Sequence, residues 1–107
     1  MATDQALGQV EPAAATVTDI YTVPASKRST VRVSVANRGG ANLIYRLSLA
    51  PLGAADATVQ YFVYDETLDA NASGISPPMV MATTDKIRAY TDTATLVVTV
   101  NGIEQDV

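Results

Sequence analysis

The sequence predicts a small all-β domain, a single antiparallel β-sandwich with Greek-key or jelly-roll-like connections. Val31, Val33 and Val35 alternate with polar residues, and the segment 43–49 repeats the same two-residue period. Turn-forming residues recur about every 8 to 12 positions, and no helix of useful length fits between them. These two observations favour antiparallel pairing over parallel crossover units. An eight-strand jelly roll and a seven-strand immunoglobulin-like sandwich both fit this spacing.

Composition limits the chain to one domain without cysteine chemistry. Its 107 residues are 48% hydrophobic, and a chain of this size buries roughly two-thirds of its unfolded surface around one core. It contains one Phe, five Tyr and no Trp, so the core is expected to be mainly aliphatic. It also contains no Cys and no His, which excludes disulfides and the commonest zinc sites. No glycine-rich phosphate loop or other cofactor motif is recognisable.

The charge balance argues against two classes of partner. Seven Lys and Arg residues face eleven Asp and Glu residues, for a formal charge of −4, and the basic residues are scattered along the chain. An acidic chain without a basic stripe is a poor ligand for nucleic acid or an anionic membrane. No apolar run approaches the ~20 residues of a membrane-spanning helix.

Residues 1–14 are predicted to form a flexible N-terminal arm, and residues 15–107 the β-sandwich domain. The first segment shows no strand pattern and ends near Pro12. A short helix over residues 3–10 is the alternative, although Gly8 weakens it. The sizeable apolar side chains of this segment after the first methionine are Leu7 and Val10. We expect these two residues to contact a neighbouring subunit when the arm becomes ordered.

The first strands follow from alternation and from the residues that stop it. A strand over 17–23 ends at Pro24, which cannot donate to a ladder. The clearest strand covers 30–36 and is closed by the polar, glycine-containing turn 37–40. The segment 43–49 is expected to return as its antiparallel neighbour.

The second half contains most of the aromatic residues and a pair of prolines. A fourth strand is predicted over 58–64, followed by a long turn, or a short strand plus turn, over 65–73. Residues 75–81 are interrupted by Pro77-Pro78, which predicts an edge strand or a kinked crossover. The closing strands are expected over 86–90 and 95–100, the latter ended by Asn101-Gly102.

Acidic residues offer few candidates for chemistry. Asp65, Glu66 and Asp69 form a conceivable calcium site, but their spacing matches no calcium loop and is more typical of a solvated turn. Asp65 paired with Asp85 or Asp92 would be needed for a glycosidase, and a chain without Trp has little with which to build a sugar cleft. Serine chemistry lacks a histidine base. We therefore assign no catalytic residue, metal ligand or cofactor, and expect a protein that is not an enzyme.

Two tyrosines of the fourth strand are candidate partner contacts. In a regular strand Tyr61 and Tyr64 point to opposite faces, so both faces would carry aromatic surface. One face is expected to fill the core. The other packs either under a loop of the same chain or against a neighbouring subunit, because aromatic residues are enriched in interface cores.

Several segments resemble small virion proteins of tailed bacteriophages. They are 21–25 (YTVPA), 33–40 (VSVANRGG), 50–56 (APLGAAD) and 61–65 (YFVYD), and the resemblance runs from about Thr16 to Gly102. These motifs are turns and strand edges, and no catalytic residue is carried over with them.

The resemblance implies an accessory component of the virion, assembled in the host cytoplasm. The first expectation is a capsid decoration or cement protein, a homo-oligomer that contacts the major capsid protein. A tail, baseplate or fibre-associated component is the second. A carbohydrate-binding sandwich that uses Tyr61, Tyr64 or Tyr90 is the third.

Overall fold

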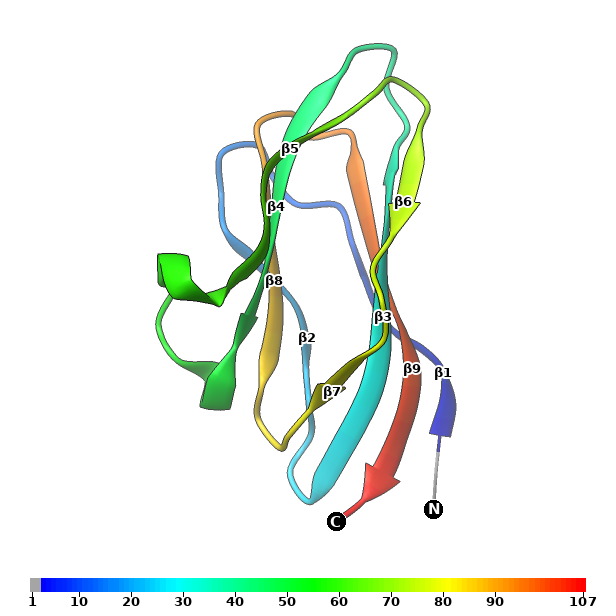
Figure 1. The fold of residues 1–107 in the computed structure, drawn as a ribbon. Helices are drawn as coiled ribbons and strands as arrows, with labels where there is room; N and C mark the ends of the chain where they lie inside the picture. Colours follow the sequence, from blue (N-terminus) through cyan, green and yellow to red (C-terminus); the bar gives the residue numbers. More distant parts are fainter. Residues whose placement is uncertain (1–2) are drawn as a thin grey trace.

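The computed structural model describes residues 3–107, and their side chains from residue 7 onward. It confirms the predicted class, because two antiparallel sheets pack face to face as a β-sandwich (Figure 1). The β3 sheet contains β1 (Thr3–Val10), β9 (Leu96–Asp106), β3 (Lys27–Asn37), β6 (Ser73–Ile75) and β7 (Met79–Met81). The β4 sheet contains β2 (Thr18–Thr22), β8 (Lys86–Thr91), β4 (Leu43–Ala50) and β5 (Tyr61–Leu68). Two short 3-10 turns, η1 (Pro51–Gly53) and η2 (Thr58–Gln60), connect β4 to β5.

The strand order is that of a jelly roll. The pairing is nested: β1 pairs with β9, β2 with β8, β3 with both β6 and β7, and β4 with β5. All of these pairs are antiparallel, and the β3–β9 and β4–β8 pairs complete the two sheets. Nested pairing of this kind arises when a long two-stranded ribbon folds over into two sheets, as in double Greek-key jelly rolls. The topology therefore selects the jelly roll from the two architectures that fitted the spacing.

The prediction that 43–49 pairs with 30–36 is wrong. β3 and β4 lie in different sheets, and β3 pairs along its whole length with β9. Both strands have the expected alternation, with Val33 and Leu47 almost completely buried. A two-residue period identifies the side chains that face the core, but strands facing each other across the core satisfy it as well as adjacent strands do.

Over residues 3–10 the structure differs from the expected flexible arm. Residues 3–10 form β1, which pairs with β9 in a register that places Val10 opposite Val98. Leu7 and Val10 are partly buried and pack against the core of their own chain. A register shift between Ala6 and Gly8 breaks the alternation that would reveal the strand in the sequence. Residues 1–2 of the predicted arm lie outside the described residues.

The closing strand runs past the predicted stop at Asn101-Gly102. β9 continues to Asp106, and Gly102 lies opposite Val31 within the β3–β9 ladder. A Cβ atom on Gly102 would stand 2.0 Å from the carbonyl oxygen of Thr30. Glycine is required there by close approach of two backbones, which is one of the uses of glycine inside strands.

The two prolines interrupt an edge, as predicted. β6 and β7 both pair with β3, and Pro77-Pro78 separates them. Ser76 bridges the gap: its backbone N–H donates to the oxygen of Val33 at 2.8 Å, and its Oγ accepts from the Val33 N–H at 2.9 Å. Both backbone groups of Val33 are thus satisfied although a regular strand cannot form beside it.

The core between the sheets is mainly aliphatic, as the composition predicts. The β3 sheet contributes Val31, Val33, Val35, Leu96, Val98, Val100 and Met81, and the β4 sheet contributes Ile20, Tyr21, Leu43, Tyr45, Leu47, Leu68, Ile87 and Ala89. Side chains that alternate with these project from the outer faces of the sheets.

Candidate functional site

Three tyrosines and one arginine gather on the outer face of the β4 sheet. We call Arg46, Tyr61, Tyr64 and Tyr90 the Tyr–Arg cluster. Arg46 on β4 pairs directly with Tyr90 on β8. The carbon at the centre of its guanidinium lies 4.3 Å from the ring centroid of Tyr64 and 4.6 Å from that of Tyr90. Both distances are typical of cation–π contacts, each worth about 0.5–1 kcal/mol at an exposed site.

Two irregularities in β5 bring Tyr61 and Tyr64 together, so the prediction that they face opposite ways is wrong. Val63 pairs with Leu47 and Tyr61 with Ser48, so β5 contributes one residue more than β4 over this step. As a result the two tyrosine rings touch edge to face, with centroids 5.3 Å apart and planes inclined at 77°. An edge-to-face geometry is favourable for aromatic pairs.

The second irregularity extends β5 into the predicted turn over 65–73. Glu66 pairs with Tyr45 and Val63 with Leu47, which again inserts one extra residue into β5. Asp65 adopts a positive φ of 52° at this bulge, a conformation that Asp tolerates better than most residues. The bulge directs Tyr64 to the outer face while Glu66 shares the inner face with Tyr45.

The cluster is held in place by charge. Arg46 Nε donates to Asp65 Oδ1 at 2.5 Å, and this hydrogen bond raises the pKa of the guanidinium. The Arg46 side chain is 26% exposed and that of Asp65 is 46% exposed. Tyr61 donates its hydroxyl to Asp56 Oδ1 at 3.0 Å, and its pKa is raised, first by burial and then by this hydrogen bond. An arginine fixed between rings and a carboxylate loses little further entropy when a partner binds.

A second ion-pair group fixes the loop beside the cluster. Asp19 accepts from Lys86 Nζ and from Arg88 Nε, each at 2.9 Å, and the hydrogen bond from Lys86 is the main cause that lowers its pKa. Arg88 is buried and also donates through Nη1 to the carbonyl oxygen of Ala54 at 2.7 Å. The loop between β4 and β5 is therefore attached to the outer face of the sheet.

The acidic residues considered for chemistry have structural contacts instead. Asp65 is paired with Arg46, and the bulge turns Glu66 to the opposite face. Asp85 accepts from the backbone N–H groups of Leu52 and Ala82, each at 2.9 Å, and Asp92 accepts from that of Ile44. Among the side chains that the structure describes, those of residues 7–107, no three acidic groups are placed together as metal ligands.

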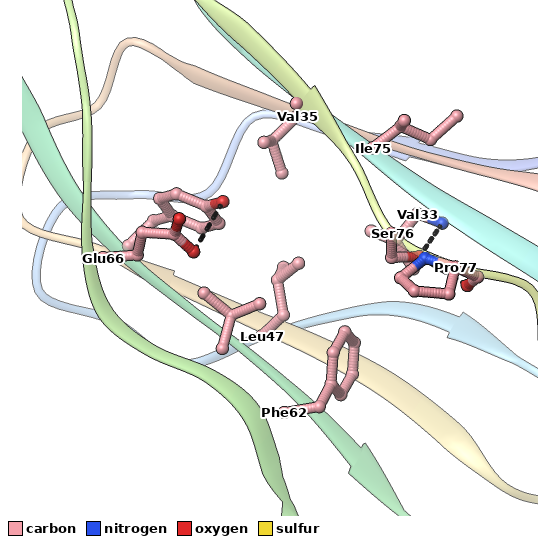
Figure 2. Close-up of a pocket in the computed structure, with 11 residues that line it drawn as sticks. Val33, Val35, Leu47, Phe62, Glu66, Ile75, Ser76 and Pro77 are labelled. Atoms are coloured by element: carbon pink, nitrogen blue, oxygen red, sulfur yellow. Dashed lines mark hydrogen bonds between the residues drawn. The ribbon is translucent and has the colours of Figure 1, made fainter.

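A cleft opens between the two sheets on the other side of β5. It has a volume of about 290 Å³ and is lined by Val33, Val35, Tyr45, Leu47, Phe62, Val63, Glu66, Gly74, Ile75, Ser76 and Pro77. Figure 2 shows Glu66 at one end of this space and Ser76 and Pro77 at the other. The Tyr45 hydroxyl donates to Glu66 Oε2 at 3.5 Å, and the pKa of Tyr45 is raised, mainly by burial.

The predicted partner contacts thus have two different positions. Tyr61 and Tyr64 are in one exposed cluster, with Tyr64 53% exposed. Leu7 and Val10 pack within their own chain. Sequence reasoning missed Arg46, although its position between the inward-facing Tyr45 and Leu47 indicated an outward direction.

Comparisons with known proteins add no family. No protein-family model matches the chain, and no curated protein matches it either. Among the residues that the structure describes, none belongs to a helix with the length and hydropathy needed to cross a membrane.

Proposed function

We propose that this chain is a structural virion protein of a tailed bacteriophage, a capsid decoration or cement protein. It binds the major capsid protein, or another virion protein, through the Tyr–Arg cluster and stabilises the shell by non-covalent contacts. The carrying observation is the arginine held between Tyr64 and Tyr90 on the outer face of the sandwich. The resemblance of the sequence to small phage virion proteins supplies the biological setting.

The composition of the cluster supports a protein partner. Tyr and Arg are enriched among the residues that contribute most to interface affinity, especially where they are ordered before binding. Tyr64 contacts both Tyr61 and Arg46, while Tyr61 is hydrogen-bonded to Asp56 and Arg46 to Asp65. A partner that buries them would exclude water from these contacts and strengthen them.

The jelly-roll architecture is compatible with a virion role, but the same architecture also serves other functions. Jelly rolls occur in viral capsid and lectin domains, among others, and a fold hosts many functions. The glycan alternative requires open ring faces for stacking, and Arg46 covers one face of both Tyr64 and Tyr90. This arrangement favours a protein partner over a sugar.

The proposal is tested by the melting temperature of expanded capsids with and without the purified protein. A protein that binds only the assembled shell raises its stability by mass action, so the shell should melt at a lower temperature without it. Arg46→Ala should weaken binding to the shell about tenfold or more, as expected for an interface hot spot. Arg38→Ala is the matched control, because Arg38 is exposed and ion-paired to Glu11, outside the cluster. Equal melting with and without the protein would refute the cement role.

Copy number distinguishes the tail, baseplate or fibre alternative. Decoration requires hundreds of copies in each particle, roughly in step with the coat subunits, whereas tail parts are few. Quantitative gel analysis of purified virions gives the ratio. Light scattering of the isolated protein tests whether it is the homo-oligomer that a lattice-binding role favours.

A further inference from the structure

The cleft between β5 and β6 is apolar along its floor and open along one side of the sandwich. Its floor is formed by core side chains, including Val33, Val35 and Leu47. Phe62 and Ile75 border it and remain 37% and 65% exposed. Figure 2 shows both side chains beside this space, one from each sheet. Apolar groups at the rim of a preformed hollow are a feature of binding sites for apolar side chains.

One of the two edges that border the cleft can accept a further strand. β5 is the last strand of its sheet, and in the part of the chain described here nothing pairs with its outer edge. Residues 61–68 contain no proline. The opposite edge is unsuitable, because Pro77-Pro78, which cannot donate to a ladder, follow β6 closely. β5 has bulges between Tyr61 and Val63 and between Val63 and Glu66, and bulges protect an edge from pairing. An extended peptide can therefore add to the regular residues 66–68 of β5 and direct alternate side chains into the cleft beyond them.

The carboxylate of Glu66 favours a positively charged group on whatever binds in the cleft. This carboxylate lines the cleft, and the contact that the structure gives it there is the Tyr45 hydroxyl at 3.5 Å. No Lys or Arg of the described residues forms an ion pair with it. A carboxylate beside apolar walls favours a cationic group on a chain that also fills the hollow.

A second copy of this chain is a poor occupant. The edge strands β1, β2, β5, β6 and β7 contain no Lys or Arg. Pairing of β5 with β5 of another copy would bring the Asp65 and Glu66 carboxylates of both chains close together, which is unfavourable. Charge complementarity therefore points to a protein of different sequence.

We propose that the cleft between β5 and β6 binds an extended segment of another protein, which pairs with β5, fills the cleft with alternate apolar side chains and places one Lys or Arg against Glu66. The main-chain hydrogen bonds would supply affinity, and the pattern of inward side chains would supply specificity. The inference goes beyond the decoration role and does not depend on it, because this site and the Tyr–Arg cluster use different surfaces.

Two synthetic peptides test this proposal on the full chain. In acetyl-TKTVTVT-amide the Lys and both Val residues share one face of a strand, and acetyl-TVTVTKT-amide presents the same face in the opposite direction. Titration of the isotope-labelled protein to about 2 mM peptide would detect a Kd of the order of 1 mM. We expect one of them to shift the backbone amides of β5 and the methyl groups of Val35 and Leu47.

The contribution of Glu66 to peptide binding is tested with separate variants. Glu66→Gln should raise the Kd of the responding peptide about fivefold, the size expected for one partly exposed charge pair. Asp69→Asn, a matched loss of an exposed neighbouring charge, should leave the Kd unchanged, and replacing the peptide Lys by Glu should abolish binding. The proposal is overturned if neither peptide shifts β5, if the shifts map to another surface, or if Glu66→Gln binds as the wild type does.

Discussion

Gly102→Ala is the sharpest test of the β3–β9 pairing at the centre of the fold. The added Cβ atom would stand 2.0 Å from the oxygen of Thr30 and 2.8 Å from Cα of Val31. Real Cβ contacts essentially never fall under 3.0 Å, so the strands must separate locally by about 1 Å. The neighbouring atoms are backbone, and a rotamer change cannot relieve the contact.

The cost follows from the contacts that this separation weakens. Two ladder hydrogen bonds at about 1 kcal/mol each, with overpacking strain of about 1–2 kcal/mol, predict a loss of about 3 kcal/mol of unfolding free energy. For a domain of this size the melting temperature should fall by roughly 10–20 °C. Urea unfolding followed by circular dichroism measures the change directly.

Gly40→Ala provides the control. Apart from Gly40 itself and its two chain neighbours, no heavy atom lies within 4 Å of the position that its Cβ would take. The stability of Gly40→Ala should therefore remain within about 0.5 kcal/mol of the wild type. If Gly102→Ala were as stable as Gly40→Ala, then β9 would not pass Thr30 as described, and the predicted turn at Asn101-Gly102 would regain support.

Three further predictions concern other parts of the chain. Deletion of residues 1–10 should destabilise the domain by about 2 kcal/mol or more, seen as a lower urea midpoint, because Leu7 and Val10 are part of the core packing. Asp85→Asn should cost about 1–2 kcal/mol by the same measurement, because Asn keeps only one of the two side-chain oxygens that accept from the backbone N–H groups of Leu52 and Ala82. Burial, followed by the hydrogen bond to Glu104, raises the pKa of Tyr21 from 10.0 to about 12. The folded state therefore holds that proton more tightly, and stability is full below about pH 10 and falls toward pH 12. Tyr21→Phe should show a shallower decline in urea midpoints over that range.

Alternation was sufficient to predict the class of the fold and most of its strands. Val31, Val33 and Val35 are all buried as their period requires, and Pro77-Pro78 marks an edge. The pairing partner of each strand could not be predicted in this way. A two-residue period indicates which side chains face the core, but it does not indicate which strand lies alongside. β1 was not predicted as a strand for a related reason, because its bulge between Ala6 and Gly8 interrupts the two-residue period.

The candidate surfaces were predictable only in part. Aromatic residues in the segment 58–64 indicated where exposed rings would be found, but Arg46 joins Tyr90 through the β4–β8 register and Tyr64 through the bulged β4–β5 register. Neither register can be predicted from the residues that neighbour Arg46 in the sequence. A site assembled across three strands therefore requires the sheet to be known before its members can be grouped.

The bulge at Asp65 links both proposed surfaces. In an unbulged β5, Tyr64 and Glu66 would project from the same face, because residues two apart share a side of the strand. The extra residue separates them, so that Tyr64 contacts Arg46 on the outer face and Glu66 lines the cleft between the sheets. The positive φ of Asp65 carries a conformational cost, and its carboxylate offsets part of this cost by pairing with Arg46. One residue thus sets the direction of the tyrosine that supports protein docking and of the carboxylate that supports peptide binding, and bulges serve this purpose of re-aiming side chains at binding sites in other β proteins.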